Sequence, residues 1–415
     1  MSYSRMTHDE LAQALLHAVR AQHFESTADA LRGGSPLAHF PSLDLALIAF
    51  PANAPPVWAN VLFSRERPHG LVAEIDATAG GVRNVRYAAD RTDSKLVSDA
   101  WLPGADWSRL HFASLAGEGA HRFVAPYPAS LIKVMVAIGV ARQVDAGACA
   151  WDTPVVHQGR TRAAAAWAED MIAFSCNDST SALVALLHAR GSIVREGARE
   201  VHNALHDAFA AQGLHTLRLA DTQPDGGWGN VAGAGVGHLQ MTAWDSARLL
   251  WLLDADAPPA PWLPRGTPPL VSDASRARIR GWLDDQALHE ILSSTALAGV
   301  PGWVRGLPAA VPARWIGADG SVIADAEHAF PADVRPASSR AELHFAHKTG
   351  TTENYASDAG IVRGIAPRRR HYIVSLMTNL GTRYTPGALC ATTWRLPALG
   401  AAIDAALAPW LEGTA

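Results

Sequence analysis

The chain has 415 residues, 48% of them hydrophobic, and a formal net charge of −4 at pH 7. At roughly 150 residues per domain, this length predicts two or three structural units with a large apolar core. The absence of a basic excess argues against a nucleic-acid-binding protein. The sequence contains no run of about 18 apolar residues, so no membrane-spanning helix is predicted.

The first 105 residues are predicted to form a small α+β region. Residues 8–32 have the pattern of an amphipathic helix that ends at Gly33-Gly34. The pattern leaves open whether this region is a domain of its own or an extension of the main domain. Four short β-like runs follow the helix: Leu45–Phe50, Val57–Phe63, Gly70–Ile75 and Val82–Tyr87.

Residues 106–415 are predicted to form a second, larger domain. Two short strands at 110–115 and 122–124 precede an apolar helix, Leu131–Ala141. A helical lobe over about 140–295 is expected from helical patterns at 163–175, 178–190, 196–212, 242–254 and 274–292. A proline- and glycine-punctuated stretch, 297–341, reads as an irregular insertion.

The end of the chain is predicted to be β again, with a last helix over about 397–411. Short turns between strands favour an antiparallel sheet. The expected fold class is therefore α+β, with an antiparallel sheet flanked by helices and an all-α lobe. The three C-terminal strands are Leu343–Lys348, Ala356–Gly364 and Tyr372–Thr378.

The N-terminus and the cysteines predict location and redox class. The first ten residues are polar and mixed in charge, unlike a secretory signal, so a cytoplasmic protein is expected, or a periplasmic one if a signal has been removed. Cys149, Cys176 and Cys390 are too few and too scattered for a disulfide framework or a zinc site. We expect neither a metal nor another cofactor.

Lysine is rare in this chain, which makes the lysines present informative. The 35 basic residues are 32 arginines and three lysines, Lys95, Lys133 and Lys348. Arginine stays protonated in proteins, whereas a buried lysine can lose its proton and act as a base. Lys95 lies in a polar stretch and is expected at the surface. The other two lysines, Lys133 and Lys348, lie in motifs that could take part in catalysis or substrate binding.

Ser130 and Lys133 form the first motif, Ser-x-x-Lys, at the entry to an apolar helix. Positions i and i+3 share a helix face, so hydroxyl and amine can meet. A serine needs an adjacent base to become a nucleophile, and burial lowers the pKa of a lysine toward that role. A lone charge in so apolar a helix is costly unless it has a purpose.

Two further motifs follow along the chain. Ser175-Cys-Asn177 comes where a helical pattern ends. Its serine could pass a proton and its amide could hold a carbonyl, although, taken alone, the motif is better explained as an ordinary helix cap. His347-Lys348-Thr349-Gly350 ends a strand, followed by Thr351. Lysine and threonine there can bind a carboxylate, and glycine permits close approach of a substrate; a plain strand-end turn is the alternative.

Taken together and in this order, the three motifs follow the signature of class A β-lactamases and penicillin-binding proteins. The chain resembles that superfamily over roughly residues 106–415. The resemblance implies an antiparallel sheet built from both chain ends, with an all-helical lobe between them. It also implies roles: Ser130 as nucleophile, Lys133 as base, Ser175 as proton relay, Asn177 as orienting amide, Lys348 and Thr349 as carboxylate holders, Gly350 as the close-approach position, and the backbone N–H groups of Ser130 and Thr351 as oxyanion hole.

The pattern departs from the β-lactamases where they carry a water-activating glutamate. Gln223-Pro224 stands where Glu-Pro is expected, and glutamine cannot act as a general base. Asp221 or Asp225 could substitute, although loop carboxylates are more often solvated turn residues. Two unrelated hydrolase classes are disfavoured: His289-Glu290 lacks the second histidine of a zinc-protease helix, and no Gly-x-Ser-x-Gly elbow is present.

The sequence thus predicts a serine hydrolase that forms an acyl-enzyme on an amide, ester or lactam. A biosynthetic acyltransferase or esterase with the same Ser-Lys machinery is the first alternative, and a penicillin-binding sensor without turnover is the second. The expected partner is a small or peptide-like acyl substrate that carries a carboxylate, with no nucleic acid and no membrane. The oligomeric state stays open.

Overall fold

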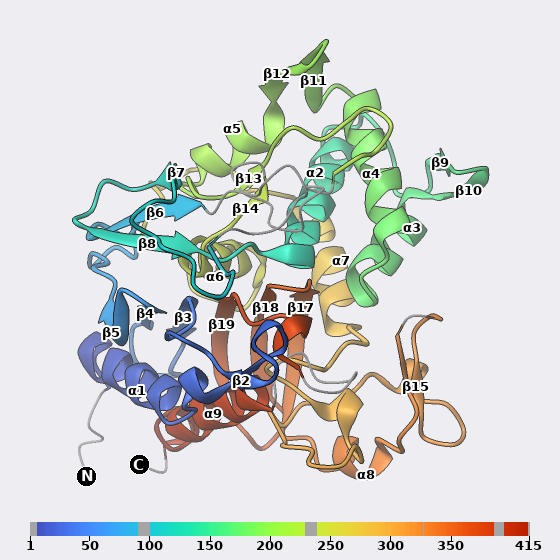
Figure 1. Ribbon diagram of the computed structural model, residues 1–415. Coiled ribbons are helices and arrows are strands. Elements are labelled where there is room, and N and C mark those ends of the chain that lie inside the picture. Colours follow the sequence, from blue (N-terminus) through green and yellow to red (C-terminus); the bar gives the residue numbers. More distant parts are fainter. Residues whose placement is uncertain (1–5, 90–99, 229–238, 327, 386–393, 414–415) are drawn as a thin grey trace.

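A six-stranded antiparallel sheet forms the centre of the molecule (Figure 1). The computed structural model describes residues 6–89, 100–228, 239–326, 328–385 and 394–413; Lys95 and Cys390 lie outside these ranges. The strand order is β17-β18-β19-β3-β4-β5, and each neighbouring pair is antiparallel. The bounds are β17 Leu343–Thr351, β18 Ala356–Gly364, β19 His371–Thr378, β3 Leu43–Ala49, β4 Val57–Ser64 and β5 Arg67–Val72.

Both faces of the sheet are covered, so its central strands are buried throughout. Strand β3 alternates between two cores: Leu45 and Leu47 join the cluster with the terminal helices, whereas Ala46 and Ile48 join the cluster of the helical lobe. Alternation of this kind follows from the period of two in a strand. Helices α1 (His8–Arg20) and α9 (Arg395–Glu412) pack together on one face, and α6 (Ala243–Leu253) lies on the other (Figure 1).

The helical lobe lies beyond α6 and also contains two short hairpins, at 154–163 and 193–203. The predicted α+β fold class is confirmed. A small sheet beside the lobe, in the order β7-β6-β8, combines an antiparallel and a parallel pair. Its strands are β6 Val85–Ala89, β7 Ala113–Ala116 and β8 His121–Ala125; the lobe helices are α2 Lys133–Asp145, α3 Ala164–Ala173, α4 Asn177–Ala189, α5 Ala204–Ala211 and α7 Asp273–Asp284.

The regions 1–105 and 106–415 share the central sheet. Strand β19 pairs with β3 along seven residues, from Tyr372 opposite Ala49 to Thr378 opposite Leu43. Residues from the start of the chain therefore complete the sheet that carries β17. Among the described residues, no helix is long and apolar enough to cross a membrane.

Three expected helices are shorter than their sequence patterns. The helix expected over 8–32 ends at Arg20, because the chain turns at His23 (φ 49°) and Asp29 then pairs with the buried Arg383 from the far end of the chain. The helix expected over 274–292 ends at Asp284. There Gln286 donates its side-chain amide to the carbonyl oxygens of Ile172 and His347, contacts that no local pattern reveals.

The helix expected over 196–212 is wrong in its first half. A hairpin of β11 (Ile193–Glu196) and β12 (Arg199–Asn203) precedes α5. The turn contains Gly197 at φ 59°, a conformation that glycine adopts without strain. Asn203 then caps α5 by accepting from the backbone N–H of Leu205. Glycine and asparagine were the sequence signals for this boundary.

The insertion 297–341 folds around an apolar cluster of its own. Val311, Val322, Phe330 and Val334 are buried in this cluster. The elements inside it are short: η5 Ala313–Trp315, β15 Val322–Ile323, β16 Ala329–Phe330 and α8 Arg335–Ser338. Its side chains reach the functional site described next.

Candidate active site

The three motifs converge on one pocket between the edge strand β17 and the helical lobe. Ser130 lies in a 3-10 turn (Ala129–Ile132) just before α2, Ser175 and Asn177 lie where α3 passes into α4, and Thr349 lies on β17. The pocket has a volume of about 630 Å³. Its lining residues are Ser130, Ser175, Cys176, Asn177, Asp178, Leu288, Glu290, Asp325, Ala326, His328, Thr349, Gly350 and Thr351.

Lys133 is fully buried and its amine contacts the second motif. Its Nζ donates to Asn177 Oδ1 at 2.7 Å, to Ser175 Oγ at 3.1 Å and to the Ser175 carbonyl oxygen. Burial holds the pKa of Lys133 well below its usual value, and the positive charge of Lys348 acts in the same direction. Among the described residues the Ser130 hydroxyl has no hydrogen-bond partner, so the expected contact with Lys133 is not formed here.

Ser175 connects the two buried lysines. Its hydroxyl oxygen accepts from Lys133 Nζ at 3.1 Å and from Lys348 Nζ at 2.9 Å. Lys348 also donates to the backbone carbonyl of Thr349 at 2.8 Å. Burial lowers the pKa of Lys348 to about 7, and the carboxylates of Glu290 and Asp358 oppose that shift. A hydroxyl between two amines of lowered pKa is well placed to pass a proton.

The backbone is strained at two of these positions. Ala129, directly before Ser130, has φ 50°, and Ser175 has φ 68°. Left-handed conformations cost a non-glycine residue of order 1–3 kcal/mol and cluster at functional sites. Gly350 lies against the same turn: a Cβ there would come within 2.7 Å of both Pro128 O and Ser130 N. The turn that carries Ser130 is thus held tightly against β17.

Behind the Lys-Thr-Gly strand lies a buried pair that the sequence analysis missed. His347 Nδ1 and Asp358 Oδ1 are 2.7 Å apart on neighbouring strands, and both side chains are fully buried. Burial lowers the pKa of His347 well below its usual value and raises that of Asp358 well above its usual value. The pair therefore tends toward its uncharged form, and its contact links β17 to the neighbouring strand β18.

Three ionisable side chains of the pocket that lie far from the motifs in the chain were also missed. Glu290 lies after α7, and Asp325 and His328 come from the insertion. Asp325 Oδ1 is 2.9 Å from His328 Nδ1 and accepts from the His328 backbone N–H at 2.7 Å. No sequence signal could have found them, because their distance from the motifs in the chain hides their place in the pocket.

Comparisons with known proteins found similar chains among solved structures only. Neither a protein-family model nor a curated protein matches the chain. Among solved structures, the chain is similar to a class A β-lactamase from Bacteroides cellulosilyticus DSM 14838, with 12% identity over 99% of this chain and 100% of that chain and a TM-score of 0.47. It is also similar to a β-lactamase from Sphaerobacter thermophilus DSM 20745 (13% identity, 95% and 96% covered, TM-score 0.45) and to an acyl-enzyme complex of PBP-A with penicillin G (13%, 96% and 96%, TM-score 0.46).

The TM-scores of these three similarities lie between 0.45 and 0.47. At 12–13% identity, the chemistry of this chain has to be argued from the side chains in its own pocket.

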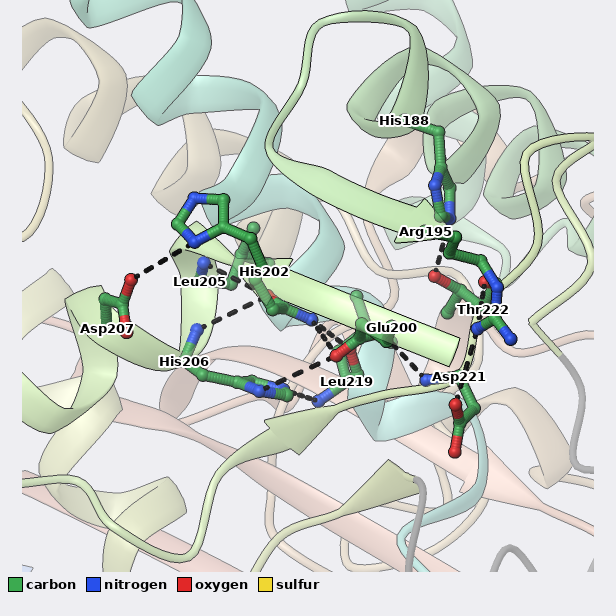
Figure 2. A network of polar contacts seen from close by, with 11 residues as sticks. His188, Arg195, Glu200, His202, Leu205, His206, Asp207, Leu219, Asp221 and Thr222 are labelled. Atoms are coloured by element: carbon green, nitrogen blue, oxygen red, sulfur yellow. Dashed lines mark hydrogen bonds and ion pairs between the residues drawn. The ribbon is translucent and has the colours of Figure 1, made fainter. Parts of the chain in front are cut away.

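The three candidates for water activation lie elsewhere. Within the described residues, the pocket lining includes none of Asp221, Gln223 and Asp225, and all three are exposed. Figure 2 shows Asp221 directed toward Arg195, with Asp221 Oδ1 3.3 Å from Arg195 Nη1. The Asp221 backbone N–H donates to Glu200 at 2.9 Å (Figure 2), Gln223 donates to the Asp221 carbonyl, and Asp225 accepts from the backbone of Gly227.

Within the described part of this loop, Trp228 contacts Lys133. Its ring lies 5.4 Å from Lys133 Nζ. An indole ring offers a cation–π contact to an ammonium but no oxygen to bind or deprotonate water.

Proposed function

We propose that the chain is a serine hydrolase that forms an acyl-enzyme through Ser130 on an amide, ester or lactam. The observation that carries the proposal is the buried arrangement around Ser175, whose hydroxyl accepts from Lys133 Nζ at 3.1 Å and from Lys348 Nζ at 2.9 Å, in the pocket that Ser130 lines. A buried lysine of lowered pKa is the base that a serine requires.

The proposed reaction begins when Lys133 takes the proton of Ser130 and the serine oxygen attacks the carbonyl carbon. The bond from that carbon to the leaving group then breaks, and Ser175 passes the proton to the departing atom. Asn177 orients the acyl side, while Lys348 and Thr349 hold a carboxylate of the substrate. The backbone N–H groups of Ser130 and Thr351 stabilise the oxyanion; one such donor is worth about 10²–10³ in rate.

The second step separates hydrolysis from acyl transfer. Hydrolysis needs a group that activates water, and the loop candidates Asp221, Gln223 and Asp225 are exposed outside the described pocket lining. This placement favours the second candidate function, an acyltransferase or esterase in which deacylation is slow in the absence of an acceptor. A penicillin sensor without turnover would be the limiting case, in which the acyl-enzyme is not deacylated at all.

The test is intact-protein mass spectrometry after mixing with a fluorescent penicillin, for the parent protein and for Ser130→Ala. A persistent adduct on the parent that Ser130→Ala loses is the expected result, and peptide mapping should locate it on Ser130. Rapid hydrolysis without adduct, again lost in the variant, would assign a β-lactamase with another water-activating group. If adduct or turnover survives in Ser130→Ala, the proposed nucleophile is wrong.

Binding of carboxylate ligands is expected to weaken as pH rises through neutrality. The Lys348 amine is cationic below its pKa of about 7 and loses its charge above it. From about pH 6 to about pH 8 the charged fraction falls about tenfold, and affinity for a carboxylate should fall with it. Calorimetric titration with a non-reactive carboxylate and its neutral amide measures the effect. An affinity for the carboxylate that is as flat with pH as that for the amide would contradict the role of Lys348.

A further inference from the structure

Glu290 is an acid in the pocket wall that the proposed mechanism does not use. It is partly buried, and it lines the pocket together with Ser130 and Thr349. Among the described residues its carboxylate forms neither a hydrogen bond nor an ion pair. A partly buried carboxylate without a partner carries a desolvation cost that a ligand cation can remove.

The charges around Glu290 set what it can attract. Burial raises the pKa of the Glu290 carboxyl and Asp358 acts in the same direction, while His328 and Lys348 oppose the shift. A cation bound beside Glu290 would likewise favour its charged form. Lys348 has its own partners, because its Nζ donates to Ser175 Oγ and to the Thr349 carbonyl. Asp325 adds a second acid to the same wall, engaged with His328. The wall therefore holds the acids Glu290 and Asp325, and the fully buried Lys348, next to the lining residue Thr349, acts on Glu290 electrostatically.

We infer that Glu290 is a specificity-determining residue that binds an ammonium group on the leaving group of the substrate, next to the carboxylate that Lys348 and Thr349 hold. This inference rests on the proposed function and narrows it. The substrate class is an acyl compound whose leaving group carries a zwitterionic, amino-acid-like end. The carboxylate lies against Lys348 and Thr349, and the ammonium lies against Glu290. When the leaving group carries a carboxylate but no ammonium, Glu290 stays without a binding partner and contributes nothing to affinity.

The chemistry of the step is unchanged by this assignment. Ser130 Oγ forms a bond to the carbonyl carbon, the bond to the leaving oxygen or nitrogen breaks, and the proton from Ser130 reaches that atom through Lys133 and Ser175. Glu290 takes no part in bond making. It binds the far end of the leaving group and thereby orients the scissile bond.

Three phenylacetyl esters with the same phenol-type leaving atom test the inference. The leaving groups are tyrosine (ammonium and carboxylate), its desamino analogue (carboxylate only) and tyramine (ammonium only). Pre-steady-state acylation is followed by phenol release and by intact mass. The parent should prefer the tyrosine ester over the desamino ester by about tenfold or more, the size of one charge pair at a partly exposed site.

In Glu290→Gln this preference should disappear, with acylation by the desamino ester unchanged or faster. Glu290→Asp keeps the charge and should retain part of the preference. Glu118→Gln, an exposed acid outside the described pocket lining, makes the same change in net charge and should leave the preference intact. Thermal unfolding of each variant checks the fold.

The outcomes separate this inference from the proposed function. If Ser130→Ala abolishes acylation but Glu290→Gln leaves the preference intact, only the role of Glu290 is wrong. If Glu290→Gln slows all three esters equally, Glu290 supports Lys348 and does not select substrates. If none of the esters acylates a parent that a penicillin does acylate, the inference falls and the proposed function stands. If Ser130→Ala still reacts, both statements fall.

Discussion

Replacing Lys133 by arginine is expected to lower the acylation rate by about 10³-fold. Arginine stays protonated in proteins and cannot take the proton of Ser130, and a positioned general base is worth about 10²–10⁴ in rate. The burial that holds the pKa of Lys133 well below its usual value would also make a permanent guanidinium charge costly at this position. Stability must therefore be measured beside the rate.

The measurement is the single-turnover rate of Ser130 acylation as a function of pH, with thermal unfolding of each variant. In the parent the rate should rise as the Lys133 amine loses its proton and should reach its plateau well below the usual lysine pKa of about 10.4. Lys95→Arg makes the same exchange at the lysine expected at the surface and should leave the rate unchanged. A parent profile that still rises near pH 10.4, or an active Lys133→Arg protein, would rule out the neutral base.

Replacing Gly350 by alanine is expected to lower acylation by about 10²-fold while leaving the protein folded. The added Cβ would lie 2.7 Å from Pro128 O, 2.7 Å from Ser130 N and 2.6 Å from Ser357 Oγ. Two of these atoms belong to the backbone of the turn that carries Ser130, so the turn must move. A displacement of about 1 Å in a catalytic group can cost 10² in rate, and overpacking costs about 1–3 kcal/mol in stability.

Gly281→Ala is the matched control for this change. Gly281 lies in α7, and a Cβ there would meet nothing within 4 Å. Alanine should therefore be neutral or slightly stabilising at this position, because it is the better helix former. Acylation kinetics and thermal unfolding of both variants give the comparison. Full activity in Gly350→Ala would show that the turn tolerates the shift and that its contact with β17 does not position Ser130.

Much of the fold could be predicted because its signals are local. The strands β18 and β19 carry the apolar patterns that placed them, and the Ser-x-x-Lys helix begins where its proline-rich entry ends. Two of the three helix errors, over 8–32 and 274–292, arose where distant contacts act, whereas the error over 196–212 overlooked the local signals Gly197 and Asn203. Helix α7 stops at Asp284 because Gln286 binds carbonyl groups of Ile172 and His347, which lie far away in the chain.

The candidate site shows the same division between features that follow from local sequence and features that depend on distant contacts. The sequence alone predicted which residues carry the chemistry, since the order of Ser130, Lys133, Ser175, Asn177 and Lys348-Thr349-Gly350 and the scarcity of lysine are local facts. Only the tertiary structure decided what surrounds them. It placed Glu290, Asp325 and His328 in the pocket, and it left Asp221 outside, paired with Arg195. The physical reason is that a side chain's chemistry follows from its identity, whereas its neighbours, burial and pKa depend on contacts between segments that are far apart in the chain.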